Sequence, residues 1–245
     1  MIAFALIGLI LWVTNSFVGN PISRALATHA INKYLETNYA ELNLEVKPAV
    51  YNFKIGKYNA WAKSKESVDT HFTVYCTMGG KVTADDFEDR IPSGWNTYTR
   101  IEKEYREFVT PIIESNLPYD FYIVLADLER LEKPAAKLPL DMNLDVYNVP
   151  LAAYVTVYLY TDDVSWDNVA GTALELDGLM QENSLAVDQY TVVLKPGSPE
   201  EEKKGESLGI YDFPQELLGS DDLPKFMEEY FYQWENGMNN VKKSK

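Results

Sequence analysis

Residues 58–63 (YNAWAK) and 70–77 (THFTVYCT) decide the expected fold, because they are rich in Tyr, Phe, Val and Thr and alternate in character. Alternation with a period of two is typical of strands that bury one face. Residues 42–53 are similar in composition, and the turn signals 54–57 (KIGK) and 78–81 (MGGK) separate the three segments. This part of the chain therefore predicts an antiparallel meander.

Helical patterns flank the meander on both sides. Asn20-Pro21 is a helix-start signal, because Asn caps a helix and Pro suits its first turn, and apolar residues then recur at helical spacing to about Tyr39. After a polar connection at 82–90, Ser93 is expected to cap a second helix over 94–116, which has a continuous apolar face. These elements predict a first α+β domain over residues 21–118.

The second half repeats this mixture of strands and helices. Residues 121–128, 144–146, 154–160, 187–194 and 208–211 have strand character. A helix capped by Asp162 or Asp163 is expected to run to about Gln181, and a last helix follows Asp221-Asp222. The order is similar to split βαβ units, and it predicts a second α+β domain over residues 119–245.

The chain starts with an unbroken apolar run at residues 2–13 (IAFALIGLILWV). Counted to Val18 it is at the low edge of the roughly 17–25 residues that cross a bilayer. Three interpretations compete: a membrane anchor over residues 1–20, a cleaved signal peptide, and a buried core helix. We favour the anchor, because a signal peptide carries basic residues before its apolar core and this run has none. The expected fold class is therefore α+β, with an N-terminal transmembrane or hydrophobic helix followed by two small domains, each an antiparallel sheet packed with helices.

Two arguments from the sequence give opposite orientations of the body relative to the membrane. Arg24 and Lys33 follow the apolar run and by themselves favour a cytoplasmic body. Long acidic domains, however, are exported largely regardless of charge. We expect a single-pass protein of the cell membrane with an extracytoplasmic body.

Composition excludes several functional classes. The chain has 37 Asp and Glu against 22 Lys and Arg, a net charge of −15, which argues against a nucleic-acid partner. One Cys excludes an internal disulfide framework and a Cys-rich zinc site, and two His are too few for a multi-histidine metal centre. Common nucleotide-binding and hydrolase motifs are absent from the sequence. We therefore expect no metal and no cofactor.

Four residues are candidates for contact with a ligand or partner: Asp69, His71, Trp95 and Asn96. Asp69 and His71 share one strand face, so the histidine is either a base with an acidic neighbour or a structural histidine bonded across the sheet. Trp95 and Asn96 belong to an unusual run at 90–97 (RIPSGWNT), where the tryptophan either contacts a partner or packs under the following helix. The carboxylates at 85–89 suggest either a cation site or a helix cap in a solvated turn.

Four short stretches carry a family resemblance: 19–23 (GNPIS), 68–73 (VDTHFT), 87–90 (FEDR) and 93–97 (SGWNT). Together they resemble the YfjL-like family of small membrane-anchored proteins from Gram-positive bacteria. The resemblance covers mainly residues 1–118, and the missing basic residues before the apolar run depart from the family pattern. It implies an anchor and a body in two parts, but it supplies no catalytic residues.

The expected function is that of a membrane-anchored, extracytoplasmic, non-enzymatic binding or regulatory protein of the cell envelope. Its expected partners are the membrane, through the N-terminal helix, and an envelope protein. The alternative is an envelope hydrolase or cation-dependent enzyme that uses acidic residues and His71. A third hypothesis is a soluble cytoplasmic α+β protein with a hydrophobic first helix. Convergence of Asp69, His71 and the carboxylates at 85–89 in one deep pocket would favour the enzyme.

Overall fold

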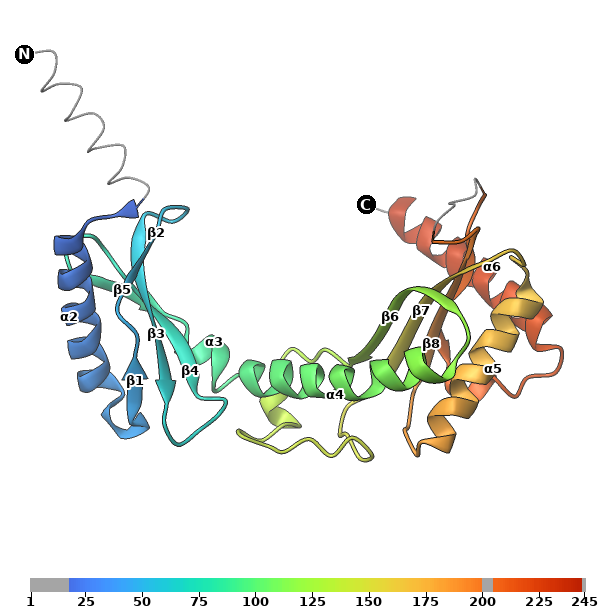
Figure 1. Cartoon of the computed structure of the whole chain (residues 1–245), viewed down its shortest axis with the longest axis horizontal. Helices are drawn as coiled ribbons and strands as arrows, with labels where there is room; N and C mark the ends of the chain where they lie inside the picture. Colours follow the sequence, from blue (N-terminus) through green and yellow to red (C-terminus); the bar gives the residue numbers. More distant parts are fainter. Residues whose placement is uncertain (1–17, 200–204, 244–245) are drawn as a thin grey trace, which may run out of the picture. The chain divides into compact units, whose positions relative to one another are not determined.

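The computed structural model describes residues 18–199 and 205–243, and the chain forms two compact units of α+β architecture (Figure 1). The first unit comprises the chain up to Arg100 together with Glu132–Met142. The second comprises Ile101–Leu131 and the chain from Asn143 onward. The predicted boundary between residues 118 and 119 separates two domains that would each fold independently. That boundary stays a prediction.

Helix α2 (Pro21–Asn38) begins at the predicted signal. The Asn20 side chain accepts a hydrogen bond from the Ser23 N–H at 2.7 Å, which satisfies one of the donors left free at a helix start. The helix ends as the N–H of Tyr39 bonds the Leu35 carbonyl, and the short 3-10 turn η1 (Ala40–Leu42) follows. One face of α2 is buried, which places the helix against the sheet.

The first sheet is antiparallel, in the order β1-β3-β4-β5, with β2 also pairing β3. Residues 42–53 form two short strands instead of one, because Pro48 between them has no N–H to donate to a ladder. The prediction of a polar connection over 82–90 is wrong at its start, where β5 pairs with β4 before the short helix α3 (Phe87–Arg90). The strands are β1 (Leu44–Val46), β2 (Val50–Asn52), β3 (Lys57–Ser64), β4 (His71–Cys76) and β5 (Val82–Asp85).

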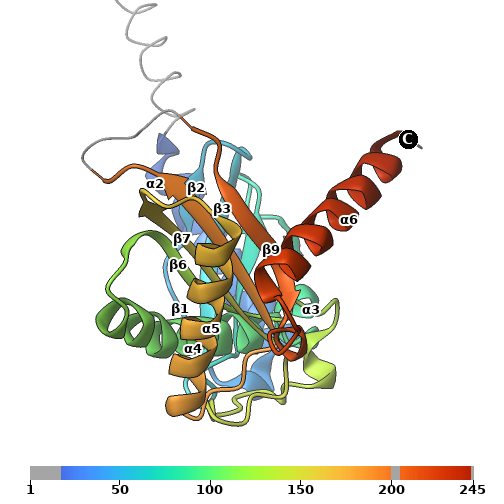
Figure 2. The same cartoon turned by 90° about the vertical axis from the view of Figure 1, so that its right-hand side faces the viewer.

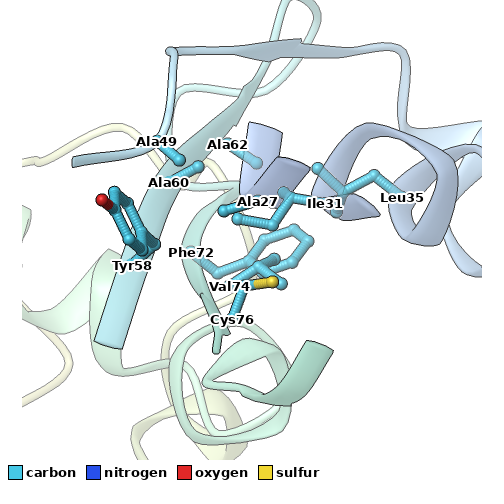
Figure 3. Close-up of a cluster of buried hydrophobic side chains, with 10 residues drawn as sticks. All are labelled: Ala27, Ile31, Leu35, Ala49, Tyr58, Ala60, Ala62, Phe72, Val74 and Cys76. Carbon is cyan, nitrogen blue, oxygen red and sulfur yellow. The ribbon is translucent and has the colours of Figure 1, made fainter. Parts of the chain in front are cut away.

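The core of the first unit lies between α2 and one face of this sheet. Figure 3 shows Ile31 and Leu35 of the helix beside Phe72 and Val74 of β4. Strands β3 and β4 bury every second residue, as their alternation predicts. Cys76 is fully buried in this cluster, and burial raises the pKa of its thiol.

The Tyr58 hydroxyl connects β3 to the start of α2. It accepts the Asn20 N–H at 2.8 Å and donates to the Asn20 carbonyl at 3.0 Å. Tyr58→Phe leaves both backbone groups without this partner, so we expect the free energy of unfolding to fall by about 1–3 kcal/mol. Urea denaturation measures the change. Tyr75→Phe on the other face of the sheet is the control, and an equal loss in both variants would contradict this role of Tyr58.

Helix α4 (Trp95–Asn116) confirms the long helix expected over 94–116. Ser93 contributes to its start, since its hydroxyl accepts the Trp95 N–H at 3.1 Å. The predicted apolar face is buried at Ile101, Tyr105, Val109 and Ile113. The first residues of this helix belong to the first unit and the remainder to the second.

The second unit contains a four-stranded sheet in the order β6-β7-β8-β9. Strands β7 and β8 are parallel, so the expectation of a purely antiparallel sheet is wrong here. The reason is helix α5, which connects these two strands and lies against β8 and β9 (Figure 2). Ser165 caps α5, instead of Asp162 or Asp163, and residues 144–146 are not a strand. The elements are β6 (Asp120–Leu128), β7 (Ala153–Thr161), α5 (Trp166–Glu182), β8 (Gln189–Pro196), β9 (Leu208–Pro214) and α6 (Leu223–Lys243), with 3-10 turns η2 (Pro134–Ala136) and η3 (Gln215–Leu217).

The transmembrane helix of the expected fold class is wrong for the part of the chain that the structure describes. None of the helices within 18–199 and 205–243 is long and apolar enough to cross a membrane. Helix α2 shows why, because it buries a single face and carries Arg24, Lys33 and Glu36 on the remainder. The anchor expected over residues 1–20 falls outside the described residues except for 18–20.

Candidate functional site

Asp69 is a buried carboxylate in the turn between β3 and β4, with only 1% of its surface exposed. Arg100 of α4 binds it through two parallel hydrogen bonds, Nε to Oδ1 at 2.7 Å and Nη2 to Oδ2 at 2.9 Å. The same Nη2 donates to the Met142 carbonyl at 2.6 Å. The buried carboxylate is thereby paired with a guanidinium that is 20% exposed.

Asp141 adds a second connection to this network. Its N–H donates to Asp69 Oδ2 at 3.1 Å, and its own Oδ1 accepts the Asp69 N–H at 2.9 Å. The backbone of Asp141 is left-handed, with φ of 59°, a conformation that Asp tolerates better than most residues. The segment Glu132–Met142 is thereby joined to the rest of the first unit, and a Cβ on Gly94 would collide with its backbone at Ala135.

The charge state of Asp69 follows from these contacts. Burial alone raises the pKa of this carboxyl, but the hydrogen bonds and charge of Arg100, together with the Asp141 N–H, outweigh burial. The pKa of Asp69 therefore lies below its usual range, and the group is ionised at neutral pH. A carboxylate held this way is a poor proton acceptor.

Asn96 connects two of the other predicted residues, Asp69 and His71. Its side-chain amide donates to the carbonyls of Asp69, at 2.8 Å, and His71, at 2.7 Å, and lies 3.4 Å from His71 Nδ1. Asn96 is 3% exposed, so these bonds satisfy a buried polar group. Burial is the largest influence on His71 and lowers the pKa of its ring, which is neutral at pH 7. The structure thus brings Asp69, His71 and Asn96 together.

Trp95 is the neighbour of Asn96 in the chain. The hydrogen bonds given above for Asp69 and Asn96 do not involve it. Its ring is half-buried and packs against Tyr98 one turn along α4, with centroids 5.5 Å apart. The ring thus packs against the helix, as in the second of the two expected alternatives, and its contact with a ligand or partner stays a prediction.

Two of the four carboxylates at 85–89, those of Asp85 and Asp86, have structural partners. Asp85 accepts hydrogen bonds from the hydroxyls of Tyr34 and Tyr39, at the end of α2. Asp86 accepts the Thr73 N–H and pairs with Arg90 at 3.3 Å. Within the described residues no group of three metal-binding side chains is present. The Asp69 carboxylate and the Asp85 and Asp86 carboxylates therefore have separate partners, and the catalytic alternative stays a prediction.

A hollow of about 490 Å³ lies elsewhere, between α2 and β1. Leu35, Leu44 and Val46 supply its apolar lining, and Asn32, Glu36 and Asn43 its polar lining. None of the four predicted contact residues lines it, so His71 and Asp69 do not converge there.

The face of the first sheet opposite α2 carries a partly exposed tryptophan, Trp61. Lys47 Nζ lies 4.9 Å from the centroid of the Trp61 ring, and the His71 ring lies 5.6 Å from it. We define the Trp61 face by the half-buried residues that share this side of β3 and β4: Asn59, Trp61, Lys63, His71, Thr73 and Tyr75. Aromatic side chains such as Trp and Tyr are enriched at protein contact surfaces.

The sequence predicted part of this site and missed the rest. Arg100 and Asp141 were not among the candidates, since neither lies in a motif and each is far from Asp69 in the chain. The alternation of β3 identifies Trp61 as a residue of the face opposite the core, and this signal was available.

The chain belongs to the YfjL-like family. Residues 1–86 match the YfjL-like N-terminal domain, and residues 104–228 match the YfjL-like C-terminal domain. No curated protein and no solved structure matches the chain. Membership of the YfjL-like family is thus confirmed for both halves, although the stretches 87–90 and 93–97 lie between the two matched regions; membrane anchoring and a Gram-positive origin stay predictions.

Proposed function

We propose that this protein is a non-enzymatic binding or regulatory protein of the Gram-positive cell envelope, held at the membrane by its apolar N-terminal segment, with its body outside the cytoplasm. The observation that carries the proposal is the contrast between its charged and its aromatic groups. Asp69, Asp85 and Asp86 are engaged in structural hydrogen bonds, whereas Trp61 lies partly exposed beside Lys47 on a sheet face. The Trp61 face is the contact surface for an envelope protein.

Membrane association has its own support in the sequence. The run at residues 2–13 contains no charged or polar side chain. Such a run partitions into a bilayer by burial of apolar surface. The localisation is tested by fractionating cells that express the full chain, and recovery in the soluble fraction would contradict it.

Trp61→Ala is expected to abolish or strongly reduce capture of the partner when the full-length protein is used as bait on solubilised envelopes. Large aromatic side chains at the centre of an interface commonly contribute 2 kcal/mol or more, which is about a thirtyfold loss of affinity. The measurement is the amount of each protein captured by wild type and variant, determined by quantitative mass spectrometry.

Tyr122→Ala is the matched control. Tyr122 is an exposed aromatic residue of the second unit with a lysine over its ring, Lys195 Nζ at 4.1 Å, so it has similar surroundings on another sheet. This variant should capture the same proteins as wild type. Equal capture by wild type and the Trp61 variant would exclude the Trp61 face as the contact surface, and turnover of a substrate would contradict the non-enzymatic proposal.

A further inference from the structure

The net charge of −15 conceals an uneven distribution. Residues 18–35, 46–65 and 70–84 contain none of the 37 acidic residues and eight of the 22 basic ones. These three segments form most of α2 and of the first sheet. The first unit is therefore basic over most of its helix and sheet, although the chain as a whole is acidic.

One end of this unit combines basic and exposed apolar side chains. The start of α2 and the turn between β2 and β3 lie at that same end (Figure 1). The Asn20–Tyr58 hydrogen bonds and the bond from the Ala49 N–H to Thr28 Oγ1, at 3.1 Å, join the helix to these strands. The turn between β4 and β5 is adjacent, since Gly80 lies against Leu26 of the helix.

We call this region the basic end. Its apolar members are largely exposed, with 75% of Ile22, 55% of Phe53 and 48% of Ile55 accessible. The other exposed apolar side chains there are Val18, Leu26 and Val50. Its basic residues are Arg24, Lys54, Lys57 and Lys81, and the first acidic residue along α2 is Glu36, in the last turn.

We propose that the basic end is a second membrane contact, which rests on a bilayer containing anionic phospholipid. Exposed aromatic and aliphatic side chains interleaved with Lys and Arg match the interfacial region of such a bilayer, where apolar groups enter the acyl boundary and cations pair with phosphates. The apolar run of residues 2–13 directly precedes this end in the chain, so a membrane that holds the run lies within a few residues of it. The inference rests on the proposed membrane association.

The proposed lipid contact gives a role to the difference in charge between the basic end and the rest of the chain. The acidic remainder of the chain is repelled by an anionic surface, whereas the basic end is attracted to it. The first unit is thereby oriented with the turn between β2 and β3 toward the lipid. The opposite turn, between β3 and β4, points away from the lipid because β3 separates the two turns.

The test places a polarity-sensitive nitrobenzoxadiazole label on the full-length protein at Ile55→Cys. The native Cys76 is fully buried and does not compete for the reagent in the folded protein. The control is Val68→Cys, an equally exposed apolar residue (50%) in the turn at the other end of β3. Both proteins are mixed with vesicles of phosphatidylcholine alone or of phosphatidylcholine with phosphatidylglycerol, and vesicle flotation is measured in parallel.

The proposal expects a blue shift and a gain in emission at position 55 with the anionic vesicles, and no change at position 68. Arg24→Gln should weaken this response about fivefold, since a basic residue near an anionic surface contributes about that factor, and Lys65→Gln at the other end should leave it unchanged. Flotation without a shift at position 55 would overturn the lipid contact and leave the membrane association intact. Absence of flotation would overturn both. A label at position 55 that is already blue-shifted without vesicles would show that the protein covers this end itself, which would also overturn the contact.

Discussion

Replacing Arg100 by Met is expected to lower the free energy of unfolding by about 3–5 kcal/mol, because it leaves the buried Asp69 carboxylate without its charged partner. The measurement is urea denaturation of the full chain, with reaction of the buried Cys76 thiol as a probe for opening of the first unit. Lys103→Met is the control, since this exposed lysine of the same helix pairs only with Glu107 at 3.5 Å among the contacts described. Equal losses in the two variants would contradict the structural role of Arg100.

Two further measurements separate the lost charge pair from a general packing defect. Adding Asp69→Asn to the Arg100 variant removes the unpaired charge, so part of the lost stability should return. The pH dependence should also change. The pKa of Asp69 in the folded wild type is depressed, so its ionised carboxylate stabilises the fold at pH values above the ordinary carboxyl pKa. This contribution is lost as the pH falls through the folded pKa. Without Arg100, burial raises that pKa, so the gap between variant and wild type should narrow as the pH falls from neutral toward about 4.

Phe72→Ala is expected to lower the free energy of unfolding by about 3–5 kcal/mol. The Phe72 ring is buried in the first core, with the rings of Tyr39 and Phe87 at centroid distances of 5.0 and 5.2 Å. Its removal leaves a cavity that the strands cannot close and takes away two edge-to-face contacts. The Cys76 thiol in the same cluster should then react faster with a thiol reagent, because openings of this unit become more frequent.

Phe53→Ala provides the matched comparison, because it removes the same side chain from an exposed turn of the same unit. Its free energy of unfolding should stay within about 0.5 kcal/mol of wild type. A large loss in this variant, or a small one in the Phe72 variant, would contradict the placement of the core between α2 and the sheet.

Local sequence patterns predicted the helices and strands that bury only one face. The alternation of β3 and β4 marks the residues that face α2, and Asn20-Pro21 marks the helix start, since both signals depend on neighbours a few positions away. These local patterns failed where a strand forms only because it pairs with another segment of the chain. The segment 82–90 is polar as a whole, but its first four residues form a strand because β4 offers them a ladder partner.

The candidate site divides in the same way. Asp69, His71 and Asn96 were identified by type and position, and the structure brings them together. Arg100 and Asp141 were not identified, because nothing within a few residues of either one indicates a buried partner in the turn between β3 and β4. The Asp69 carboxylate is paired with Arg100, a partner that the sequence alone did not indicate.

The amino-acid sequence by itself determined the α+β class, the core faces of β3, β4 and α4, and the family of the chain, because these depend on periodicity and on short motifs. Only the tertiary structure decided that β7 and β8 run parallel, that Glu132–Met142 joins the first unit, and that exposed apolar and basic side chains meet at one end of α2. These features arise from contacts between residues far apart in the chain. Such contacts depend on which surfaces the folded elements bury against one another, and local residue patterns do not specify that choice.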